Sequence, residues 1–173
     1  MKKEIRTILK DRAIAMAREP EQKRSVSETI EIVAFTLAAE TYAIESAFVR
    51  EVYPLKDFTP LPGVPSYILG IINVRGQILP VIDLKKFFNL PEKGLGDLNK
   101  VIILCDDLME FGILADVVHG TRTVDPEDIQ NVPLTVSGIG EDYIKGVTTE
   151  NLIILNAENI LNDKKIIVNQ ETA

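Results

Sequence analysis

The hydrophobic pattern along the chain changes its period close to residue 29. Before that point, the apolar residues of Glu4–Glu19 recur every three or four positions, which is typical of one helix face, and Pro20 ends the pattern. After it, apolar residues alternate with polar ones or form short runs bounded by turn residues, which is typical of strands. The sequence therefore predicts an amphipathic N-terminal helix, a polar linker over Glu21–Ser27 and a mainly β body.

The β body is predicted to contain the same series of elements twice. Each series has three short strands, a long proline-bearing loop, a hairpin and a short helical segment. The first series is Ile30–Leu37, Tyr42–Ile44, Phe48–Tyr53, Tyr67–Ile72, Gln77–Ile82 and the helical turn Leu84–Phe88. The second series is Lys100–Cys105, Glu110–Ala115, Val117–Val124, Tyr143–Thr148, Leu152–Leu155 and a helix to Leu161 that Asn156 can cap.

The two series are also related in sequence. Ile32–Val49 aligns with Val101–Val118 without a gap, and this alignment places Tyr42 on Phe111. Two runs of β-strand can resemble one another by chance. The ungapped match and a repeated Tyr-Ile-x-Gly motif nevertheless favour an internal duplication. The two copies of the motif are Tyr67-Ile-Leu-Gly70 and Tyr143-Ile-Lys-Gly146.

Five short strands in each series, without an internal helix, predict a small closed barrel, because closure removes exposed strand edges. The predicted fold class is mainly β, with two SH3-like five-stranded barrels, an N-terminal amphipathic helix and a short C-terminal helix. Exchange of strands between the barrels is left open. The predicted segments are the helix and linker 1–28, the first barrel 29–90, the second barrel with its end helix 98–162 and a tail 163–173.

Charge and composition narrow the functional classes. The chain of 173 residues has a net charge of −7, but residues 1–30 carry a net +3 and the remainder a net −10. An acidic body argues against a general nucleic-acid binder, and simple solubility is a sufficient reason for the acidity. No apolar run reaches the ~18 residues that a membrane-spanning helix needs. A single cysteine, Cys105, excludes an internal disulfide, and we expect a cytoplasmic protein.

The residues that carry most enzyme chemistry are scarce. His119 is the only histidine and Cys105 the only cysteine, whereas a catalytic triad needs a nucleophile and a base placed together. Zinc needs three or four Cys, His or carboxylate ligands, and the acidic clusters lack the alternating ligands of a calcium loop. We therefore expect no enzymatic activity, cofactor or metal, with His119 at the surface or in packing and Cys105 in the core.

Two adjacent motifs carry a family resemblance. The turn Asn73-Val-Arg-Gly76 is followed by the strand Leu79-Pro-Val-Ile-Asp-Leu84. With these motifs, the stretch Glu31–Phe88 resembles the CheW family of bacterial chemotaxis coupling proteins. The likeness extends over residues 30–162, so residues 1–28 inherit no role from it, and the loop Asp125–Gly140 has little motif content.

The resemblance implies two SH3-like subdomains and a non-catalytic adaptor that links chemoreceptors to the histidine kinase CheA. It implies that the kinase's regulatory domain, which is similar in fold, alternates with the adaptor in rings, and we expect weak or no self-association in dilute solution. It also places the receptor's helical tip in a groove between the subdomains. The positions that match the family's groove are Val49, Glu51, Gly70, Arg75 and Val118.

Simpler interpretations exist for four of the five groove positions. Val49 and Val118 could be ordinary barrel core, Arg75 a solvated hairpin residue, and Gly70 a backbone requirement of its strand. For the whole chain, one alternative is a coupling-like scaffold of a non-motility receptor pathway. Another is a small-barrel ligand-binding or enzyme accessory domain, which would have a polar concave pocket with converging side chains.

Overall fold

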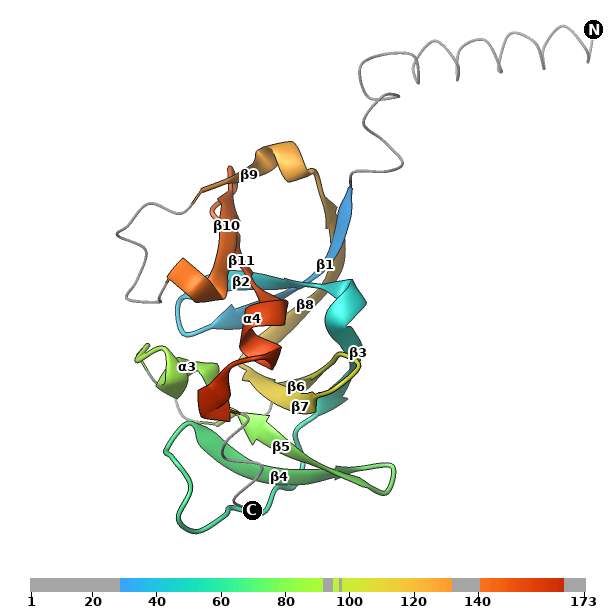
Figure 1. The fold of residues 1–173 in the computed structure, drawn as a ribbon, viewed down its shortest axis with the longest axis vertical. Coiled ribbons are helices and arrows are strands. Elements are labelled where there is room, and N and C mark those ends of the chain that lie inside the picture. Colours follow the sequence, from blue (N-terminus) through green and yellow to red (C-terminus); the bar gives the residue numbers. More distant parts are fainter. Residues whose placement is uncertain (1–28, 92–94, 97, 132–140, 167–173) are drawn as a thin grey trace, which may run out of the picture.

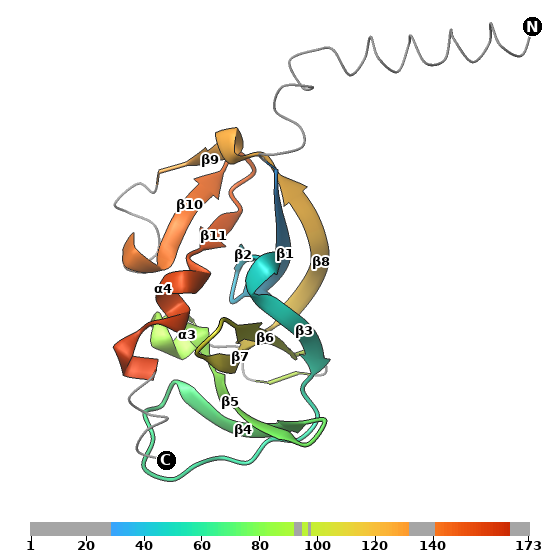
Figure 2. The ribbon, with the colours of Figure 1, turned by 45° about the vertical axis from the view of Figure 1, so that its right-hand side comes forward.

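The computed structural model describes residues 29–91, 95–96, 98–131 and 141–166. The predicted helix over Glu4–Glu19 and most of the predicted loop Asp125–Gly140 lie outside these residues. Within them the chain forms two β-sheets, stacked along the long axis of the molecule, with the short helices α3 and α4 close to the junction (Figures 1 and 2).

The elements follow the two predicted series closely. The first series comprises β1 Ile30–Leu37, β2 Glu40–Glu45, the 3-10 turn η1 Ser46–Phe48, β3 Val49–Pro54, β4 Ile68–Val74, β5 Gln77–Ile82 and α3 Leu84–Phe87. The second series comprises β6 Lys100–Cys105, β7 Glu110–Ala115, β8 Val117–Val124, η2 Pro126–Asp128, β9 Ile129–Gln130, η3 Glu141–Tyr143, β10 Ile144–Thr148, β11 Ile153–Leu155 and α4 Ala157–Leu161. Asp83 and Asn156 cap the two α-helices through their side-chain oxygens.

The mainly β, two-barrel fold is confirmed, with one difference in strand number. One sheet has the order β3-β6-β7-β5-β4, and the other has six strands in the order β8-β1-β2-β11-β10-β9. The additional strand is β9, which was predicted as loop. Its two residues are too few to show a hydrophobic period, and they follow the turn η2 and pair with β10.

The two sheets exchange strands reciprocally. The first two strands of each series, β1 and β2 or β6 and β7, join the later strands of the other series. Each barrel therefore takes strands from both sides of residues 91–97. The exchange keeps equivalent pairings, because β1 binds β8 in the same antiparallel way that β6 binds β3.

The strand registers confirm the duplication. Phe35 lies opposite Tyr42 on β1 and β2, and the aligned Leu104 lies opposite Phe111 on β6 and β7. Tyr42 and Phe111 are both fully buried. The β1–β8 and β3–β6 ladders also carry bulges at matching positions, next to Val118 and Val49 respectively. The relation therefore extends to irregularities of the backbone.

Both barrels are closed by the chain that follows their outer strand. After β3, Thr59 exchanges two backbone hydrogen bonds of 2.9 Å with Ile71 on β4. After β8, β9 pairs with β10. The glycine of each Tyr-Ile-x-Gly motif permits this approach, since a Cβ on Gly70 would lie 2.4 Å from the Thr59 carbonyl oxygen. A Cβ on Gly146 would lie 2.8 Å from the Gln130 carbonyl oxygen.

The largest hydrophobic cluster lies between the barrels and not inside either one. On β1, Ile32 and Ala34 point into their own barrel, whereas Val33 and Phe35 join the shared cluster. The aligned residues of β6 divide in the same way between the other barrel's interior and the shared cluster. This shared cluster is here called the inter-barrel core. It also contains Leu84 of α3 and Ala157, Ile160 and Leu161 of α4.

Substituting the motif glycines should destabilise the protein by opening a barrel. Gly70→Ala and Gly146→Ala each force a backbone segment to move, and we expect each to lower the free energy of unfolding by about 1–3 kcal/mol. Gly96→Ala is the matched control, because its Cβ would meet only the Asn99 side chain at an ordinary 3.8 Å. Denaturant unfolding measures all three, and equal stabilities would contradict the closure argument.

Candidate functional site

The two valines of the predicted groove occupy equivalent places in the structure. Val49 begins β3 and Val118 is the second residue of β8. Each side chain is half-buried and packs against the inter-barrel core. The fold thus brings both valines to the same hydrophobic cluster, although 69 positions separate them in the aligned repeats.

The predicted Glu51 and Arg75 meet as an ion pair. Arg75 and Gly76 have φ values of 53° and 86°, which gives the β4–β5 hairpin a type I′ turn, and Gly76 N donates to Asn73 Oδ1 over 2.8 Å. From this turn Arg75 Nη1 lies 3.3 Å from Glu51 Oε2 on β3, while the arginine side chain stays 75% exposed. Such an exposed pair adds little stability, so this charge is available to a partner.

Arg50 extends the charged surface beside this pair. Its Nε lies 3.7 Å from Glu51 Oε2, its Nη1 donates to Gln77 Oε1 over 2.8 Å, and it forms an ion pair with Glu110. The side chains come from β3, β5 and β7 of the five-stranded barrel. Sequence reasoning missed Arg50, because its contacts lie far away along the chain.

Gly70 differs from the other predicted groove residues. It is buried on β4 beneath Thr59 and Pro60, and it provides space for the barrel closure. The backbone requirement proposed from the sequence therefore accounts for this glycine by itself. Gly70 is buried against the backbone of Thr59 and Pro60, so it does not offer a partner an exposed side like that of Arg75.

Sequence analysis also missed a buried ion pair at the barrel junction. Lys85 Nζ lies 2.5 Å from Asp116 Oδ1, and the lysine side chain is only 2% exposed. In the sequence, Lys85 is one of two lysines in a short helix and resembles a surface residue. The available signal was that Asp116 is a single charged residue between two strands, β7 and β8.

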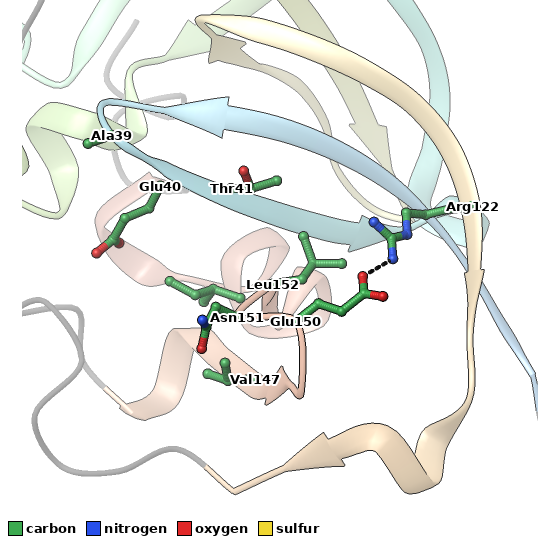
Figure 3. Close-up of a pocket in the computed structure, with 9 residues that line it drawn as sticks. Ala39, Glu40, Thr41, Arg122, Val147, Glu150, Asn151 and Leu152 are labelled. Carbon is green, nitrogen blue, oxygen red and sulfur yellow. Dashed lines mark hydrogen bonds and ion pairs between the residues drawn. The ribbon is translucent and has the colours of Figure 1, made fainter.

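Two hollows occupy equivalent positions in the two barrels. Each is lined by the cross-strand pair that follows the motif glycine, Val147 with Ile153 in one barrel and Ile71 with Pro80 in the other. The hollow of the six-stranded barrel has a volume of about 510 Å³ and contains charged groups (Figure 3). The hollow of the five-stranded barrel, of about 350 Å³, is mostly apolar. The duplicated sites have therefore diverged.

The charged groups of the larger hollow interact with one another. Arg122 reaches from β8 to form an ion pair with Glu150 in the β10–β11 turn (Figure 3). Glu40 accepts a hydrogen bond of 2.8 Å from the Tyr42 hydroxyl, and burial together with this contact raises the pKa of Tyr42. The hollow is the concavity that the ligand-binding alternative requires, but its charges already have partners within the chain.

The other chemistry-bearing residues have structural surroundings. His119 Nε2 lies 2.7 Å from Thr36 Oγ1 on the exposed face of β8 and β1. Cys105 ends β6 half-buried, so its predicted place in the core is wrong, because the strand emerges there from the barrel. Across the described ranges, His, Cys, Asp and Glu side chains form no group of three that could hold a metal ion. No helix among those residues is long and apolar enough to cross a membrane.

The fold and site define a two-barrel β protein in which a half-buried valine from each barrel packs on a shared core and an exposed arginine lies on a hairpin turn. A CheW-like domain matches residues 31–165, and the chain therefore belongs to the CheW-like family. This confirms the resemblance seen in the sequence.

Known relatives and a solved structure are consistent with this membership. The chain is 36% identical over 146 residues to a chemotaxis protein CheW of Treponema pallidum, covering 80% of this chain and 86% of the relative. It is 31% identical over 157 residues to protein FrzA of Myxococcus xanthus, covering 91% and 92%. The crystal structure of scaffolding protein TtCheW from Thermoanaerobacter tengcongensis matches with a TM-score of 0.67 and 33% identity, covering 76% of this chain and 85% of that one.

The buried carboxyl of Asp83 should make stability depend on pH. Burial raises its pKa above the ordinary 3.8, and the nearby Lys85 and Lys86 charges and backbone N–H groups only partly oppose this. The folded state then binds the proton more tightly than the unfolded state, so this contribution to stability increases as pH falls towards 3.8. We expect Asp83→Asn, which keeps an oxygen for the helix cap, to remove that contribution. The free energy of unfolding of both proteins, measured between about pH 4 and pH 7, tests this prediction. The same dependence on pH in Asp83→Asn as in wild type would contradict it.

Proposed function

We propose that this protein is a non-catalytic adaptor that couples chemoreceptors to the histidine kinase CheA in a bacterial signalling array. The observation that carries the proposal is the convergence of Val49 and Val118, which belong to different barrels, on one inter-barrel core. Family membership and the scaffolding protein of similar fold support it. In this proposal the protein acts in the cytoplasm, where the receptor tips and the kinase meet.

The receptor-binding surface is formed by the two valines and the charged pair beside them. A helix laid in a groove needs apolar contacts along one side and polar groups at the rim. Val49 and Val118 supply the apolar contacts, and Glu51 with the exposed Arg75 supplies a charged rim. A helical receptor tip fits this chemistry better than a small ligand, since these groups lie on strand surfaces and hairpin turns.

The kinase contacts are assigned to the outer ends of the barrels. Because the two barrels are related but not identical, their ends form head-to-tail contacts, which close into rings or extend as filaments. Each contact is weak by itself, and an array gains strength from many of them. A non-motility receptor pathway would use the same surfaces, so the proposal names the architecture of coupling and leaves the receptor open.

A ligand-binding function has one observation in its favour, the polar hollow of about 510 Å³ around Arg122 and Glu150. That function predicts a small molecule whose binding is lost on Arg122→Ala while receptor binding persists. Family membership and the scaffolding protein of similar fold favour the adaptor.

Arg75→Ala should weaken binding to a receptor tip without altering the fold. An exposed turn residue should change stability by no more than about 0.5 kcal/mol, whereas loss of the rim charge should lower affinity several-fold. Titration against a soluble fragment carrying a chemoreceptor's cytoplasmic tip measures the affinity. Arg122→Ala is the matched control, because it removes an exposed arginine paired with a glutamate on the other barrel. Equal affinities for Arg75→Ala and wild type would remove Arg75 from the site.

Val118→Asp should abolish binding to the same receptor fragment, because it buries a charge against the inter-barrel core or the receptor helix. A thermal melt separates loss of the surface from loss of the fold. Melting at the wild-type temperature with full receptor affinity would show that the valine is not part of the groove.

The pure protein should sediment mostly as a monomer and bind the kinase's regulatory domain with a dissociation constant of roughly 1 μM, about −8 kcal/mol. Sedimentation at several concentrations, followed by titration with that domain, measures both properties. A tight homodimer that buries the barrel ends would contradict this assembly, as would turnover of a small molecule that a single pocket substitution removes.

A further inference from the structure

One carboxylate joins elements of both barrels. Asp116 is the single residue between β7 of the five-stranded barrel and β8 of the six-stranded barrel. Its Oδ2 accepts from the backbone N–H of Ala38 in the β1–β2 turn over 2.8 Å, and its Oδ1 lies 2.5 Å from Lys85 Nζ. Asn99 is the residue before β6. Its Nδ2 lies 3.4 Å from the same Oδ1 and donates to the Ala115 carbonyl oxygen over 3.1 Å.

Breaking this ion pair should be costly. The Lys85 side chain is 2% exposed and that of Asp116 is 14% exposed, so removing either partner leaves the other charge poorly solvated. The Ala38 backbone also has a φ of 57°, a left-handed conformation that is unfavourable for alanine, and Asp116 binds its N–H. An apolar pair of similar size could fill the same space, whereas the charged pair adds directional contacts from Asp116 to Ala38 and Asn99.

The duplication itself does not require the pair. The crossover from β2 to β3 is equivalent to the crossover from β7 to β8, and the position aligned with Asp116 is Ala47 in η1. Lys85, two residues after the Asp83 cap, corresponds to Glu158 after the Asn156 cap. Only one of the two crossovers therefore carries this buried lysine–aspartate arrangement among the described residues.

We propose that Lys85 and Asp116 form an inter-barrel clamp that positions Val118 relative to Val49, so that both act as positioning residues for receptor binding. This inference rests on the proposed receptor-binding function. Asp116 lies two residues before Val118, and the Asp116 N–H donates to the Thr36 carbonyl oxygen over 3.0 Å at the same end of the β1–β8 ladder.

The clamp reaches the other valine through β6. Asn99 binds Asp116 and fixes the start of β6, and Leu104 near the end of that strand lies opposite Val49 on β3. Both valines are therefore connected to the clamp by strands that are paired along their length. A change at the clamp would alter the spacing of two half-buried residues without touching the bound receptor.

The experiment compares the affinity of clamp variants for the soluble chemoreceptor-tip fragment. Lys85→Met, which keeps the length of the side chain and removes its charge, should weaken binding about tenfold. Lys85→Arg keeps the positive charge beside Asp116 and should bind the fragment more tightly than Lys85→Met does. Lys86→Met is the control for loss of a lysine from the same helix, and it should bind as wild type does.

A second control separates positioning from general loss of stability. Ile154→Val on β11 removes a methyl group from the interior of the six-stranded barrel, away from the inter-barrel core, and should lower the melting temperature without lowering affinity. In addition, the loss of receptor affinity caused by Val118→Ala should be smaller in the Lys85→Met background than in the wild type, because a misplaced valine contributes less to binding. A structural role alone would leave that loss unchanged.

The outcomes are distinct. If the wild-type protein does not bind the fragment, the proposed function fails. A second outcome is that Lys85→Met and Asp116→Asn melt at a lower temperature than wild type but bind the fragment with wild-type affinity. In that case the clamp stabilises the fold only, and the inference is wrong. If Lys85→Met does not fold, Asp116→Asn, which keeps an oxygen for Ala38 N–H, provides the same comparison.

Discussion

The apolar packing between the two barrels is the interaction on which the rest of the structure depends. The strands β1, β2, β6 and β7 are covered on both faces, by their own barrel's interior on one side and by the inter-barrel core on the other. This explains why Ile32–Phe35 and Val101–Leu104 are continuously buried, although alternation is usual in small antiparallel barrels. The barrels therefore share one apolar core across their junction.

Strand exchange strengthens this coupling. Because each barrel borrows two strands from the other series, neither can separate without breaking β-ladders as well as apolar contacts. The duplicated parts then diverge where they face solvent. Equivalent hollows have become polar in one barrel and apolar in the other, so the two barrels offer different chemistry. Such asymmetry suits a protein that acts by holding different partners in a set arrangement.

A buried ion pair at this junction fits the same logic. Inter-barrel contacts among aliphatic side chains are non-directional and would tolerate small sliding movements. A lysine and an aspartate with hydrogen-bonded neighbours have a preferred geometry, which apolar packing by itself does not specify. The inter-barrel core supplies the free energy of association, and the Lys85–Asp116 clamp restricts it to one arrangement.

The sequence by itself determined the order of the elements, the duplication and the hairpin turn, because hydrophobic period and turn chemistry are local. The strands Ile30–Leu37, Gln77–Ile82 and Val117–Val124 have the predicted bounds for this reason. Tertiary structure alone decided which strands share a barrel, since related repeats present equivalent edges and pairing within or between them satisfies the same pattern. It also decided the burial of Lys85 and the contacts of Arg50, because a side chain's partners depend on residues distant in sequence that only folding brings close.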